Sequence, residues 1–97
     1  MNIDKWTAKM QEAIQRAITM ASEMGHQVVD VEHFLLALLE DSAGILYRVL
    51  TKANVNIADL QNKLHARLQS KPVVNNVDIN SIRISYDFNQ LINLANK

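Results

Sequence analysis

Apolar residues recur at spacings of three and four along most of the chain, which is the pattern of amphipathic α-helices. The first stripe predicts a helix over residues 7–24, with Thr7 as its N-cap and Gly25 directly after its last apolar position. A second stripe, rich in leucine, follows Asp30, whose carboxylate is suited to cap the first turn of a helix.

Three further helices are predicted from the residues that flank them. Ser42 precedes a short apolar pattern that Asn54 ends, because asparagine tolerates the left-handed conformation. Asn56 caps a longer pattern, and Pro72 prevents its continuation. The polar stretch after Pro72 predicts an extended connection with a short strand-like piece, and Ser85 begins the last helix. The chain has only 2 glycines and 1 proline, too few for the many tight turns of a β-sandwich or barrel. The helical patterns therefore predict an all-α fold.

The last helical pattern is in phase with the first. An offset of 85 − 7 = 78 residues places Ser85 on Thr7 and Phe88 on Met10. This alignment predicts a four-helix unit followed by the start of a second copy. We therefore expect a first helical repeat over residues 1–70, a linker over 71–84 and the first helix of a truncated second repeat over 85–97.

Composition narrows the class of protein. The 97 residues include 10 Lys+Arg and 10 Asp+Glu, so the formal net charge is +0, which argues against nucleic-acid and anionic-membrane partners. Cysteine is absent, which excludes disulfides and thiolate metal sites. No apolar run approaches the roughly 20 residues that span a bilayer, and the N-terminus lacks a signal-peptide pattern. We expect a cytoplasmic protein.

One run carries a family resemblance. Residues 25–40 (GHQVVDVEHFLLALLE) resemble the signature of the Clp/Hsp100 N-terminal domain, with its Gly-His turn, β-branched pair, Glu-His and Leu-rich helix. Residues 50–56 resemble that family's next element, with Asn54 in place of a frequent glycine. Residues 4–7 (DKWT) and 93–94 are most similar to the ClpB-type disaggregases. The resemblance covers essentially the whole chain.

The resemblance implies a function without catalysis. Domains of this family consist of two four-helix pseudo-repeats, of which this chain resembles the first and the first helix of the second. They are thought to capture exposed apolar segments of misfolded or aggregated polypeptides and pass them to a homohexameric ATPase, which supports protein disaggregation in the stress response. The resemblance implies no cofactor in this segment, since ATP binds to other modules of the parent protein.

Thr7, Ile92 and Leu94 are the candidate substrate-binding residues. Leu94 lies off the main apolar stripe of its helix, so it either packs against neighbouring segments or forms one wall of an apolar groove. The resemblance places Ile92 and Leu94 at groove positions. Thr7 has a structural interpretation as an N-cap, and the resemblance adds a role in substrate binding.

Glu32 and His33 invite two other interpretations. No His-x-x-x-His or Glu-x-x-His spacing is present, so we expect neither a metal site nor catalysis there. Glu32 suits the positive end of a helix dipole. In ClpC-type domains a matching glutamate helps to bind phosphorylated arginine, so an adaptor- or phosphoarginine-binding domain of ClpA/ClpC type is the alternative function.

The last helix also predicts self-association. Without further helices of a second repeat, the face that carries Phe88, Leu91, Ile92 and Leu94 should be partly exposed. We therefore expect either a monomer or a dimer through this helix.

Overall fold

The computed structural model describes residues 3–95, with side chains described for residues 8–94. The elements, in chain order, are α1 (Ile3–Glu23), β1 (Val28–Val29), α2 (Val31–Leu39), α3 (Ile45–Lys52), α4 (Ile57–Gln69), a 3₁₀ turn η1 (Ile79–Ser81), β2 (Arg83–Ile84) and α5 (Tyr86–Ala95). The prediction of an all-α fold is confirmed, because the two strands are only 2 residues long each.

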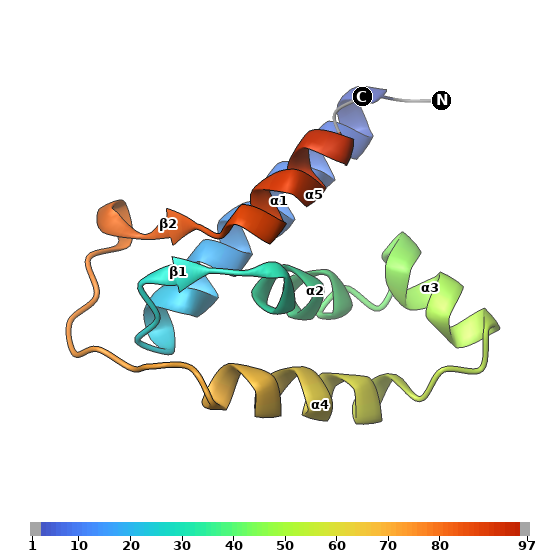
Figure 1. Ribbon diagram of the computed structural model, residues 1–97. Helices are drawn as coiled ribbons and strands as arrows, with labels where there is room; N and C mark the ends of the chain where they lie inside the picture. The colour runs from blue at the N-terminus through green and yellow to red at the C-terminus, as the bar shows by residue number, and fades with distance from the viewer. Residues whose placement is uncertain (1–2, 96–97) are drawn as a thin grey trace.

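Helix α2 lies at the centre of the molecule. It packs against α1 on one side and α4 on the other, with α3 at its C-terminal end, and it also contacts α5, which is drawn on the same side as α1 (Figure 1). The rings of Phe34 in α2 and Phe88 in α5 have centroids 5.0 Å apart. The face of α5 that was expected to be partly exposed is exposed at Leu94, but Phe88 is fully buried, so the expectation was wrong for Phe88. The physical reason is that α2 offers Phe34 as an apolar partner, and burying an aromatic pair is strongly favourable.

Most predicted helix ends are confirmed. Asp30 caps α2, and the Asn56 carboxamide oxygen accepts from the Asp59 N–H at 3.0 Å. Ser85 Oγ accepts from the Phe88 N–H at 3.0 Å. Asn54, at φ 62°, follows the end of α3 in the left-handed region, as predicted. These caps act over two or three residues, so local sequence is enough to specify them.

Two predicted caps were wrong. Helix α1 begins at Ile3, so Thr7 lies within the helix rather than at its N-cap. No glycine or proline precedes Thr7, and nothing in the chain therefore interrupts the first turn. Helix α3 is capped by the backbone of Gly44 and not by Ser42. Asp41 dictates this turn, because its carboxylate accepts from the Ala43 N–H at 3.1 Å and its carbonyl from the Gly44 N–H at 2.9 Å.

The connection after α4 closes against the α1–β1 turn. Gly25, at φ 78°, accepts from the Val74 N–H at 2.8 Å. A Cβ atom at Gly25 would lie 2.7 Å from Val73 Cγ1 and 2.9 Å from the Val74 carbonyl oxygen, so both the backbone angle and the close approach require glycine. The connection then pairs β2 with β1 in parallel, with Val28 opposite Arg83 and Val29 opposite Ile84.

No helix within residues 3–95 combines the length and the apolar character that crossing a bilayer requires.

Candidate functional site

Helix α5 presents one of the predicted site residues to solvent and holds another against the core. The Leu94 side chain is 67 % exposed, whereas Ile92 is half-buried and packs against the core. Two residues of an α-helix advance about 200°, so these side chains leave α5 on opposite flanks. Leu91, three residues before Leu94, is its half-buried neighbour on the same flank. The apolar edge of α5 therefore runs from Leu91 to Leu94.

The Thr7 side chain lies outside the part of the chain whose side chains are described. Its backbone belongs to the second turn of α1. The predicted contact of Thr7 with substrate stays a prediction.

Glu32 lies in the first turn of α2, as predicted, and has a partner from α4. The Arg67 Nε atom lies 3.2 Å from Glu32 Oε2. The carboxylate is thus already neutralised by an internal guanidinium. A cationic or guanidinium-bearing ligand that binds Glu32 Oε2 has to compete with Arg67 for that oxygen atom.

A buried histidine pair lies between three elements, and the sequence pattern did not predict it. His26, after α1, and His33, in α2, are both buried, and His26 Nδ1 lies 2.8 Å from His33 Nε2. The Asp30 N–H donates to His33 Nδ1 at 2.9 Å. His33 therefore carries its proton on Nε2 and donates to His26, which in turn donates to the Leu68 carbonyl at the end of α4. Within residues 8–94, no buried side-chain N or O atom lacks a hydrogen-bond partner.

Burial, more than hydrogen bonding, keeps both imidazoles neutral. Burial, with the nearby His26 and Lys71, lowers the pKa of His33 to about 4. Burial and Lys71 also lower the pKa of His26 below its usual value of 6.5. A buried, fully bonded and neutral pair has no free lone pair for a substrate, so the arrangement is a structural junction rather than an acid–base site.

Asp30 extends the junction to α5. Its carboxylate accepts from the Val31 N–H at 2.7 Å, from the Ser85 hydroxyl at 2.8 Å and from Lys71 Nζ at 3.3 Å. Burial opposes the negative charge, but these three donors hold the pKa of Asp30 below its usual value. The only sequence signal for the junction is the spacing Asp30-x-x-His33, a capping box in which histidine replaces the usual glutamate.

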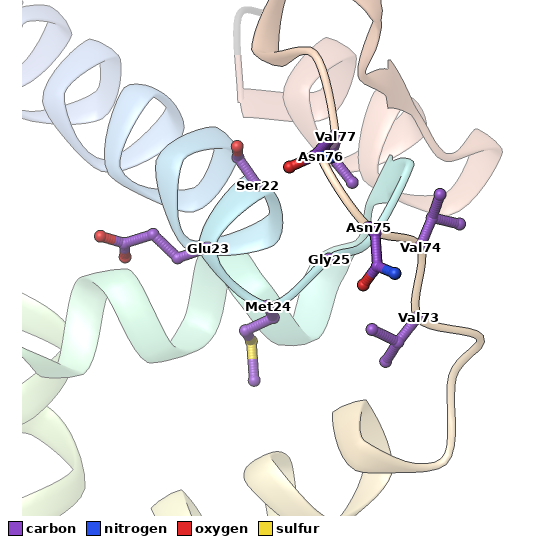
Figure 2. Close-up of a pocket in the computed structure, with 9 residues that line it drawn as sticks. All are labelled: Ser22, Glu23, Met24, Gly25, Val73, Val74, Asn75, Asn76 and Val77. Atoms are coloured by element: carbon purple, nitrogen blue, oxygen red, sulfur yellow. The ribbon is translucent and has the colours of Figure 1, made fainter.

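A metal site and a ligand-binding hollow are two further possibilities for the described residues. No three His, Cys, Asp or Glu side chains of this part of the chain converge on a point that could hold a metal ion. A hollow of about 350 Å³ lies between the end of α1 and residues 73–77 (Figure 2). Glu23 is its charged side chain, but it is directed away from residues 73–77 and pairs with Arg16 instead (Figure 2). The one charged side chain among the residues that line the hollow is therefore turned away from the segment opposite it.

Comparison with known proteins assigns the fold to a family. The Clp repeat (R) N-terminal domain family matches residues 5–97. The chain is 34 % identical to the chaperone protein ClpB of Bacillus cereus and 31 % identical to that of Vibrio cholerae, in each case over 100 % of this chain and 11 % of the relative. It is 32 % identical to the ClpB of Pseudomonas putida with the same coverage.

The chain thus spans about a tenth of the length of these relatives, and the matching family describes an accessory N-terminal domain rather than a catalytic one. The all-helical fold and the similarity along the whole chain agree with each other. The chain belongs to the Clp repeat N-terminal domain family, and its similarity is to the ClpB-type chaperones.

Proposed function

We propose that this domain binds exposed apolar segments of misfolded or aggregated polypeptides and delivers them to the ATPase modules of a cytoplasmic, ClpB-type parent protein. The observation that carries the proposal is Leu94, a large apolar side chain that is 67 % exposed on an otherwise amphipathic helix. The similarity to ClpB chaperones supports it.

The edge of α5 suits a weak and unselective interaction. Leu91 lies half-buried beneath the exposed Leu94, so a bound apolar side chain would contact both. Complete burial of one leucine side chain contributes about 1.5–3 kcal/mol, which allows binding without a demand for particular hydrogen-bonding partners. Clients differ in sequence, and an apolar edge of this kind accepts many of them.

Amide NMR spectra of the chain, recorded during titration with unfolded, reduced and carboxymethylated α-lactalbumin, test the proposal. We expect shifts that cluster on α5 around Leu94, and about tenfold weaker binding by Leu94→Ser. Val73→Ser is the matched control, since Val73 is 66 % exposed and lies on a different segment. Equal weakening by both substitutions, or unchanged binding by Leu94→Ser, would contradict the proposal.

A second titration with free phosphoarginine tests the ClpA/ClpC-type alternative. Shifts confined to Glu32 and Arg67 would favour that alternative, because the ligand would have to displace the Arg67 guanidinium from the Glu32 carboxylate. We expect no such shifts, since Arg67 already bonds to one oxygen of the Glu32 carboxylate and a ligand would have to compete with it.

A further inference from the structure

Helix α3 carries two faces of different kinds. Leu46, Tyr47 and Leu50 are half-buried and pack against the core. The opposite face carries Ile45, Arg48, Val49 and Lys52, which line a hollow of about 240 Å³. These four residues follow the i, i+3, i+4, i+7 spacing, so they form one stripe along the helix. We refer to them as the α3 stripe.

The α3 stripe is exposed although half of it is apolar. Ile45 is 73 % exposed and Val49 is 55 % exposed. The inward face already attaches α3 to α2 and α4, so the fold does not need these two side chains. An isolated exposed apolar residue is ordinary, whereas Ile45 and Val49 are adjacent on one stripe and form a small apolar patch that a partner can cover.

The unpaired positive charges of the α3 stripe indicate that a partner at this surface is acidic. Among the residues whose side chains are described, no carboxylate forms an ion pair with Arg48 or Lys52. Five other basic residues do have acidic partners: Lys9, Arg16, Lys63, Arg67 and Lys71. Helix α3 itself contains no acidic residue. A second copy packed through the same stripe would place four cations together, which disfavours a symmetric dimer at this surface.

We propose that the α3 stripe docks an acidic amphipathic helix of a partner protein. The partner's apolar side chains would cover Ile45 and Val49, while carboxylates beside them would pair with Arg48 and Lys52. The stripe is about 12 Å long, which matches two turns of a helix laid along it. Helices α3 and α5 are separate elements on different parts of the molecule (Figure 1), so this site is distinct from the proposed client edge at Leu94.

A pair of synthetic helical peptides tests the proposal. One carries leucine along one face and glutamate on both flanks, and its twin carries lysine in place of every glutamate. Fluorescence anisotropy should show that the glutamate peptide binds the chain and that the lysine twin binds at least about tenfold more weakly. Equal binding of both twins, or no binding of either, would overturn the proposal.

Charge reversal provides the sharper arm of the test. Arg48→Glu combined with Lys52→Glu should lose the glutamate peptide and gain the lysine twin. Arg83→Glu is the matched control for the single variant Arg48→Glu, because each reverses one charge. Arg83 is exposed on β2 and has no ion pair within the described residues. A loss with Arg83→Glu equal to that with Arg48→Glu would show a net-charge effect and refute a site on α3.

Two further measurements distinguish the α3 stripe from the client edge and from a membrane-binding surface. Leu94→Ser should leave binding of the glutamate peptide unchanged, and a loss there would mean that the two surfaces are not distinct. Vesicles of phosphatidylcholine with phosphatidylserine should not bind, since two cations give too little attraction for an anionic surface. Binding to these vesicles but not to the glutamate peptide would assign the stripe to a membrane instead.

Discussion

Helices α2 and α3 are neighbours in the chain and have 9 and 8 residues, yet the protein holds them in different ways. Helix α2 buries five of its residues and begins with a capping box in which Asp30 and His33 bond reciprocally. Helix α3 buries none, and Gly44 at its start provides no side-chain hydrogen bond. The difference teaches that stability is concentrated around α2, which leaves α3 free to present side chains that the fold does not use.

The largest expected effect is on the free energy of unfolding, and it compares a buried side chain of α2 with an exposed one of α3. Leu39→Ala removes a side chain of α2 that is fully buried, so we expect the free energy of unfolding to fall by about 3 kcal/mol. Val49→Ala in α3 should change it by less than about 0.5 kcal/mol, because that side chain is largely exposed. Urea unfolding followed by circular dichroism measures both. Similar losses for the two variants would show that α3 is as much a part of the core as α2.

The next effect is the dependence of stability on pH. The pKa of His33 falls from 6.5 in the unfolded chain to about 4 in the folded one, so between these values the unfolded chain binds more protons. Stability is therefore complete above about pH 6.5 and decreases as the pH falls towards 4, by about 2 kcal/mol between pH 7 and pH 5. The lowered pKa of His26 acts in the same direction.

Urea titrations at several pH values, repeated with His33→Ala, check this prediction. The variant should be less stable at pH 7 and should lose most of the dependence between pH 7 and pH 5. His65→Ala is the control, because His65 is exposed on α4. An unchanged pH dependence in His33→Ala would place the responsible group elsewhere.

The smallest effect concerns the C-terminal end of α2. Arg16 in α1 bonds to Glu40 through Nε at 2.8 Å and through a second nitrogen at 3.0 Å, and it lowers the pKa of that carboxyl group. Arg16→Ala should reduce stability by about 0.5–1 kcal/mol at low salt and by less at 1 M salt, because the pair is partly exposed. Arg48→Ala in α3 should have no measurable effect. Thermal unfolding at the two salt concentrations distinguishes the outcomes.

The same contrast explains what the sequence could predict. The Asp30 and Asn56 caps depend on residues next to them in the chain, and both predictions are confirmed. Helical phase, which is also local, placed Leu94 off the main apolar stripe of α5 but left open whether it packs or is exposed, and the structure shows it exposed. The start of α1 at Ile3 was missed because Thr7 is a good cap that the chain does not use.

The contacts of the junction could not be predicted because they depend on tertiary structure. The hydrogen bond between Ser85 and Asp30 spans 55 residues, and the ion pair between Arg67 and Glu32 spans 35. His26 and His33 are only 7 residues apart, but they meet because the turn at Gly25 redirects the chain between α1 and α2. No local pattern encodes such a meeting, so Glu32 could be placed on its helix but not given its partner.

The long reach from Asp30 to Ser85 also has a consequence for the order of folding. Closing a loop of 55 residues carries an entropic penalty of about 3–4 kcal/mol, whereas the contacts of α1 with α2 close much shorter segments. We therefore expect α5 to join after α1 and α2 have paired, because the α1–α2 contacts close the shorter loops. The segment that carries Leu94 should then show faster amide hydrogen exchange than α2, whose residues are more deeply buried.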